Sequence, residues 1–139
     1  MSRWLRIWLG LWAGLLLWLM ILVAPSLFAE LPDRALAGAL AGALFRWATW
    51  VSVGSGILLA VFTARAGSWR GSVTLLVPGA LLLVSELLVR PAMQAAKAQP
   101  GSGFAFWHGI ASAIYVLATV LVLILWWRAE ALAPLRRAE

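Results

Sequence analysis

The residues of this sequence that could do chemistry lie between positions 85 and 112. Glu86 is the only acidic residue inside an apolar run, and Arg90 follows it by four residues. His108 is the only histidine of the chain. A carboxylate and an imidazole within hydrogen-bond reach could pass a proton or form half of a metal site.

Glu86 lies about two-thirds of the way along a predicted membrane span, where a charge costs on the order of 2–3 kcal/mol. An acid at that depth usually faces the interior of a bundle and has a partner. Arg90 lies one helical turn later on the same face, which is the favoured order for an ion pair, and its long side chain can reach out to the headgroups. The alternatives are a structural ion pair, a proton or ion site, and a docking contact with another subunit.

His108 begins a second polar group on the last apolar segment. Ser112 and Tyr115 follow it at i+4 and i+7, so a helix would place all three on one face. Together with Glu86 and Arg90 they form the predicted intramembrane polar centre. The alternative for His108 is an ordinary packing and hydrogen-bonding role.

Other kinds of chemistry lack the residues that they need. The chain has no cysteine and one histidine, so disulfides and thiolate metal sites are excluded. A haem or metal site would require His108 from two copies or from a partner chain. No nucleotide-binding loop, nucleophile elbow or zincin helix is present. We therefore predict no catalytic residues, no metal site and no cofactor, and we interpret the protein as a non-enzyme.

The composition is that of an integral membrane protein. Hydrophobic residues make up 64% of the 139 residues and charged residues 12%, and the mean hydropathy is +0.96. A soluble domain is about half apolar and about a quarter charged. The net charge is +6, but the basic residues are dispersed between apolar runs. This pattern argues against a nucleic-acid partner and is typical of charges that set membrane topology.

Four apolar segments are long enough to span a bilayer, which takes about 20 residues. They predict an all-α polytopic membrane protein, with four transmembrane helices in an antiparallel bundle that forms one domain over residues 1–139. The predicted spans are 7–28, 43–64, 72–93 and 104–127. Residues 35–46 would extend the second helix past the membrane or lie in its interface. Pro78 predicts a kink in the third span, and residues 128–139 form a polar tail.

The basic residues and the tryptophans predict the same topology. Seven of the eleven basic residues fall on the side that holds the N-terminus, the loop at 65–71 and the tail. By the positive-inside rule both termini are cytoplasmic, in a membrane that we interpret as a bacterial inner membrane. Trp12 would continue the lipid-facing stripe of Trp4 and Trp8. The interface anchors are expected to be Trp4, Trp8, Trp69, Trp126 and Trp127 on the inner side, and Trp47, Trp50 and Trp107 on the outer side.

Glycines on the first two spans favour close helix contacts, because small residues let helix backbones approach each other in lipid. Packing within the chain and a face for a second copy are both consistent with this spacing. The lipid bilayer, a homo-oligomer and a larger membrane complex are the expected partners. The glycines are Gly10 and Gly14, Gly38 and Gly42 (each pair spaced GxxxG), and Gly54 and Gly56.

Several short motifs follow one another along the chain. They are VAPSLF at 23–28, LP at 31–32, AG at 37–38, LF at 44–45, RP at 90–91, and Phe104 with His108 and Ser112. In this order and spacing, over roughly residues 8–126, the sequence resembles the bacterial relatives of vertebrate transmembrane protein 205, catalogued as domain of unknown function 4149. Tyr115 departs from the family's pattern, which commonly has asparagine seven residues after the histidine. The resemblance implies a four-helix membrane protein of undefined activity.

The leading hypothesis for function is a small integral membrane protein of undefined activity that assists transport or resistance at the cell envelope. The first alternative is a structural accessory subunit, packed against a larger membrane complex through its glycine and tryptophan faces. The second is a haem or metal site shared between copies through His108.

Overall fold

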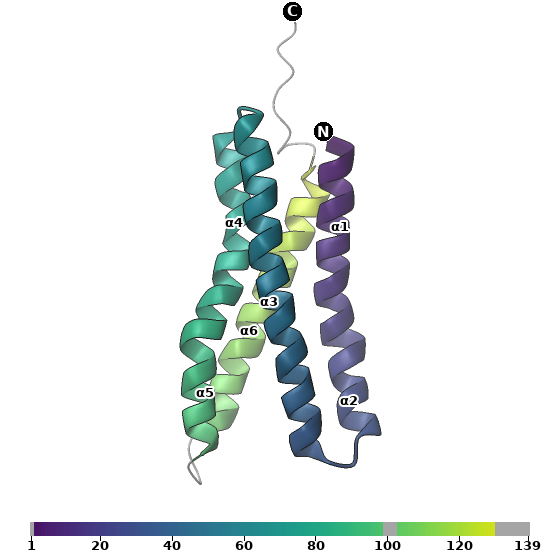
Figure 1. Ribbon diagram of the computed structural model, residues 1–139, viewed down its shortest axis with the longest axis vertical. Coiled ribbons are helices and arrows are strands. Elements are labelled where there is room, and N and C mark those ends of the chain that lie inside the picture. The colour runs from purple at the N-terminus through teal and green to yellow at the C-terminus, as the bar shows by residue number, and fades with distance from the viewer. Residues whose placement is uncertain (1, 99–102, 130–139) are drawn as a thin grey trace, which may run out of the picture.

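A computed structural model of the chain describes residues 2–98 and 103–129, and this part is helical apart from short turns (Figure 1). Four helices are long and apolar enough to cross a membrane, and each predicted span lies within one of them: Arg3–Glu30, Arg34–Arg65, Trp69–Lys97 and Phe104–Trp127. The elements are α1 (Ser2–Trp18), η1 (Leu19–Val23), α2 (Ala24–Glu30), α3 (Arg34–Arg65), α4 (Trp69–Val84), η2 (Ser85–Val89), α5 (Arg90–Lys97) and α6 (Phe104–Trp127). Most of the predicted tail lies outside the described residues.

The long helix α3 begins and ends at clear local signals. The Asp33 carboxylate accepts hydrogen bonds from the backbone N–H groups of Ala35 (2.8 Å) and Leu36 (3.3 Å), which satisfies donors that the first helical turn leaves unpaired. At the other end Gly67 has φ +87°, a conformation that glycine adopts without strain and that turns the chain into α4. With 32 residues α3 is about 48 Å long, more than the ~30 Å hydrocarbon core of a bilayer.

Two π-helical turns interrupt the first and third spans, and each is followed by a proline. Pro25 comes two residues after η1, and Pro91 comes two residues after η2. Proline lacks the N–H group and its ring crowds the carbonyl of the preceding turn, so a locally widened turn lets the helix continue. The third span was expected to be interrupted at Pro78, but the α-helix continues through this buried proline. The change in helix type lies at η2, which begins seven residues after Pro78.

The closest helix contact is between α3 and α4, and two glycines make it possible. A methyl group on Gly79 would lie 3.1 Å from the Ser52 carbonyl oxygen and 3.2 Å from the Val53 Cα. A methyl group on Gly56 would lie 3.0 Å from the Leu75 carbonyl oxygen. Since the neighbouring atoms belong to backbone, a side chain at either position would force the two helices to shift apart by a few tenths of an ångström.

Three polar contacts between buried side chains or backbone tie the helices together. The Trp12 indole donates a hydrogen bond to the Ser52 hydroxyl at 2.8 Å, which joins α1 to α3. The Tyr115 hydroxyl donates to the Leu16 carbonyl oxygen at 3.3 Å, which joins α6 to α1. The hydroxyls of Thr63 and Ser72 lie 2.9 Å apart beside the turn between α3 and α4.

Helix α6 crosses the bundle obliquely. It begins beside η2 and α5, and it passes along α1 towards its own end (Figure 1). We call the end of the bundle that holds α2, α5 and the start of α6 the α5 end, and the opposite end, which holds the first residues of α1, the α1 end. At the α5 end α6 is separated from the first span. Most side chains in the first turns of α6 are therefore exposed.

Candidate functional site

Glu86 lies in the π-helical turn η2 and is bracketed by two arginines. Its Oε2 is 2.9 Å from Nη1 of Arg90, one turn later on the same span. Its Oε1 is 3.3 Å from Nε of Arg46, which belongs to α3. The ion pair favoured by the i,i+4 spacing is therefore present, and a second arginine joins it from another helix. We call Arg46, Glu86 and Arg90 the arginine cluster.

Arg90 is held in place by the backbone of α3 as well as by Glu86. Its Nη1 donates a hydrogen bond to the Gly42 carbonyl oxygen at 3.1 Å. A methyl group on Gly42 would lie 3.5 Å from the Arg90 Nη2, so the guanidinium lies directly against this glycine. The missing side chain of Gly42 thus leaves room for an arginine side chain close to the helix backbone.

The arginine cluster carries a surplus positive charge that is open on one side. Two guanidiniums and one carboxylate give a formal charge of +1. The side chains of Glu86 and Arg90 are only 16% and 20% exposed, whereas that of Arg46 is 54% exposed. The surplus charge is therefore presented by Arg46 at the surface of the bundle.

Helix length places the arginine cluster at one edge of the apolar part of the bundle. Arg46 and Arg65 are 19 residues apart on α3, or about 28 Å. Arg70 and Arg90 are 20 residues apart on the third span, or about 30 Å. Both distances match the thickness of a hydrocarbon core, about 30 Å. Glu86 is consequently one helical turn inside this edge.

His108, Ser112 and Tyr115 do not join Glu86 and Arg90 in one centre. The His108 ring is exposed and stacks on Phe104, with ring centroids 5.8 Å apart. Ser112 is also exposed, and its hydroxyl donates to the backbone carbonyl of His108 at 2.9 Å. Within the described residues, the charged partners of Glu86 are the two arginines. A proton relay from His108 to Glu86 therefore has no geometric support.

Tyr115 faces the core although it shares a helical face with His108. Its ring packs edge-on against Phe45 at 4.8 Å, and its hydroxyl reaches α1. The difference agrees with the oblique course of α6, which begins beside α5 and runs along α1 towards its other end (Figure 1). The contact of Tyr115 with Leu16 belongs to the part packed on α1.

The predicted packing glycines divide into two groups. Gly10 lies against Trp126, Gly38 near Phe28, Gly42 against Arg90 and Gly56 against α4. Added methyl groups on Gly14 and Gly54 would meet no atom within 4 Å in the described part of the chain. Among the residues that the structure describes, no other helix therefore covers these two glycines, and their role at a face for a second copy stays a prediction.

The predicted interface tryptophans lie on the outside of the bundle, with one exception to the expected stripe. Trp4 and Trp8 are exposed, but Trp12 is 3% exposed and turns into the core, because its indole N–H finds a partner in Ser52. Trp12 is thus a core residue and the expectation that it faces lipid was wrong. The other predicted anchors are exposed or half-buried: Trp47, Trp50, Trp69, Trp107, Trp126 and Trp127.

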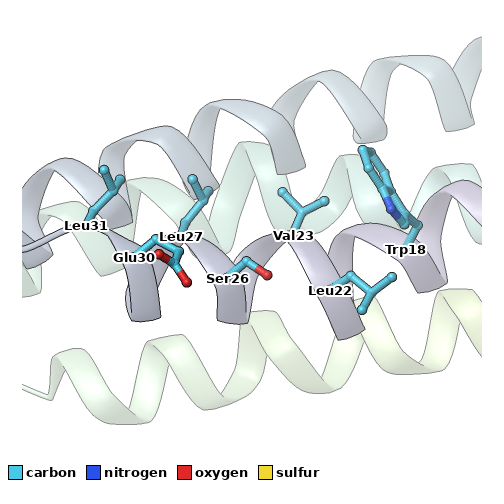
Figure 2. A pocket seen from close by; sticks show the side chains of 7 residues that line it. All are labelled: Trp18, Leu22, Val23, Ser26, Leu27, Glu30 and Leu31. Carbon is cyan, nitrogen blue, oxygen red and sulfur yellow. The ribbon is translucent and has the colours of Figure 1, made fainter.

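An open groove runs along the second half of the first span, from Trp18 to Leu31 (Figure 2). It has a volume of about 390 Å³ and is mainly apolar, with Ser26 and Glu30 as its polar residues. A second hollow, at the α1 end, is lined by Arg6, Trp126 and Trp127. Within the described residues, no three His, Cys, Asp or Glu side chains gather where a metal could bind. A haem or metal shared between copies through His108 stays a prediction.

Sequence reasoning missed Arg46, Gly79 and the Trp12–Ser52 contact. Arg46 is one of the four basic residues that the predicted topology leaves on the side opposite the termini, and no partner was predicted for it. Its partnership could have been found by counting from the turn at residues 66–68, since Arg46 and Glu86 lie at nearly equal distances before and after it. Gly79 follows a proline and has no GxxxG partner, so its spacing carries no signal.

One family model matches this chain. It is described as Domain of unknown function (DUF4149), and it covers residues 7–102, more than half of the sequence. The chain belongs to this family. The matched region holds the first three long helices with Arg46, Glu86 and Arg90, whereas α6 lies beyond it. Neither the curated proteins nor the solved structures gave a match.

Proposed function

We propose that this DUF4149 protein is a non-catalytic, four-helix protein of the bacterial inner membrane that assists a transport or resistance process at the cell envelope. The observation that carries this proposal is the arginine cluster. Three charged side chains from two spans meet at one edge of the apolar part of the bundle. Two of them, Glu86 and Arg90, are mostly buried there, and a buried charge in a membrane protein usually serves a function.

The proposed topology is an antiparallel bundle with both termini in the cytoplasm. The excess of basic residues at the α1 end and in the loop at 65–71 supports this orientation. It puts the arginine cluster at the outer leaflet, facing the periplasm. The likeness to vertebrate transmembrane protein 205 is part of this proposal and supports the four-span architecture alone.

The experiment is a complementation test in a strain from which the gene has been deleted. Resistance to membrane-active compounds would be compared between cells that carry the wild-type gene, Glu86→Gln or Glu30→Gln. We expect Glu86→Gln to lose complementation while the protein still inserts, and Glu30→Gln, at an exposed position of α2, to complement fully. Full complementation by Glu86→Gln at equal membrane abundance would contradict the proposal.

The second candidate is a structural accessory subunit of a larger membrane complex. It is favoured by Gly14 and Gly54, which lie on exposed helix faces with open space above them, as a partner helix would require. Extraction in a mild detergent should then recover a defined partner with the protein. Recovery of a monodisperse monomer alone would count against this candidate.

A further inference from the structure

We propose that the arginine cluster binds the phosphate of an anionic phospholipid, with Arg46 as the residue that contacts the headgroup. The inference rests on the proposed membrane insertion but does not depend on the envelope process. It starts from the formal surplus of one positive charge, which Glu86 alone cannot neutralise.

The geometry leaves Arg46 able to hold a second anion. The Glu86 carboxylate contacts Nε of Arg46, which lies on one edge of the guanidinium. The side chain is 54% exposed, so its outer edge is open to the surroundings. A guanidinium presents several donors in one plane and commonly binds phosphate oxygens in pairs. Arg90, which is committed to Glu86 and to the Gly42 carbonyl, adds positive charge behind it.

The position of the arginine cluster selects the kind of anion. Arg46 lies about 28 Å along α3 from Arg65, which puts one of them at each edge of a hydrocarbon core. Lipid phosphates lie at this level. The exposed Trp47 beside Arg46 is of the residue type that prefers the same boundary.

An apolar track leads from Arg46 towards the middle of the membrane. Trp50, Gly54 and Ile57 follow Arg46 at spacings of four, four and three residues, so they share its helix face, and all three are exposed. The track from Arg46 to Ile57 is about 16 Å long, close to half of a hydrocarbon core. Gly54, in the middle of this track, has no side chain and has open space above it, which an acyl chain could occupy. A lipid offers both the anion and the chain that this surface suits.

The test uses the whole protein, purified in detergent, and native mass spectrometry to count bound lipids. Phosphatidylglycerol and phosphatidylcholine with identical acyl chains would be added in turn to the wild type, to Arg46→Gln and to Arg34→Gln. Arg34 is the matched control, since it is an exposed arginine at the start of the same helix. Circular dichroism would establish that each variant keeps its helical content.

We expect the wild type to retain phosphatidylglycerol in preference to phosphatidylcholine. Arg46→Gln should lower retention of phosphatidylglycerol about fivefold, the effect of one basic residue at an anionic surface, whereas Arg34→Gln should leave it unchanged. Arg46→Lys keeps the charge without the paired donors, so its retention of phosphatidylglycerol should lie between those of the wild type and Arg46→Gln. This variant tests the inference should Arg46→Gln fail to fold.

Equal retention of the two lipids, or an equal loss in Arg34→Gln, would overturn the inference. Displacement of phosphatidylglycerol by excess inorganic phosphate would also overturn it, because the site would then take free phosphate rather than lipid. All these readouts come from purified protein, so their failure leaves the complementation test of the proposed function unaffected.

Discussion

At the scale of single residues, Trp12 shows how one hydrogen bond can decide where a tryptophan lies. Its indole N–H would lack a partner among lipid chains, and the buried Ser52 hydroxyl can accept its hydrogen bond. The bond between them, at 2.8 Å, satisfies both groups and links α1 to α3. Trp8 and Trp18 on the same helix are exposed. Trp12 is buried because it lies on the face that packs on the bundle and finds a hydrogen-bond partner there.

We expect Trp12→Phe to destabilise the folded bundle, because it removes the bond to Ser52 and some buried volume. A hydrogen bond between membrane helices contributes about 0.6 kcal/mol on average and up to about 1.7 kcal/mol, so the loss should be about 1–3 kcal/mol with the volume included. The free energy of unfolding would be measured by denaturant titration in detergent. Trp18→Phe, the same change at an exposed position, should cost less than about 0.5 kcal/mol. Equal losses in the two variants would contradict this role for Trp12.

The spacing of Glu86 and Arg90, four residues apart, was enough to predict their ion pair, because one helical turn brings the two side chains together. Arg46 could not be placed with them from local spacing, because its contact depends on how α3 and the third span align. His108 illustrates the opposite case. Its spacing from Ser112 and Tyr115 is correct for one helix face, but only Tyr115 on that face is buried, and which part of a face is covered depends on how the helices pack.

At the scale of elements, the contact between α3 and α4 depends on glycines that differ in their surroundings. Gly79 touches the backbone of α3, whereas Gly54 lies on the opposite, exposed side of that helix. Both are glycines in apolar helices, so the sequence alone does not tell them apart. Gly79 differs because backbone atoms of α3 lie where its side chain would be.

Gly79→Ala should therefore push α3 and α4 apart, whereas Gly54→Ala should be neutral or slightly stabilising. Overpacking of this kind costs about 1–3 kcal/mol, and replacing a glycine by alanine in a helix interior gains up to about 1 kcal/mol where space is free. Thermal unfolding in detergent measures both effects. A Gly54→Ala variant as unstable as Gly79→Ala would show that the exposed face of α3 is packed against another chain.

At the scale of the whole molecule, the four spans were predictable because each needs only length and apolar composition. The continuation of α3 through residues 35–46 also followed from the sequence, which has no proline there and is rich in alanine and leucine. The π-helical turns were not predicted. Prolines mark where a helix must adjust, but Pro78 and Pro91 look alike in sequence, and only the second follows a π-helical turn.

The proposed topology predicts which turns face the periplasm. The chain has no native cysteine, so single cysteines can report on each side. Glu30→Cys, at the end of α2, should react with a membrane-impermeant maleimide in intact cells. Ala66→Cys, in the turn between α3 and α4, should react only after the cells are lysed. The reverse pattern would place the arginine cluster at the cytoplasmic leaflet.

The oblique course of α6 also has a consequence for how the protein is made. During synthesis α6 leaves the ribosome after α1, α3 and α4, yet it packs on the first span near one end and on α5 near the other. Until it arrives, the Leu16 carbonyl has no Tyr115 hydroxyl, and the first span is held to α3 by the Trp12–Ser52 bond without the support of α6. A nascent chain stopped before α6 should therefore stay bound to the insertion machinery longer than a full-length one.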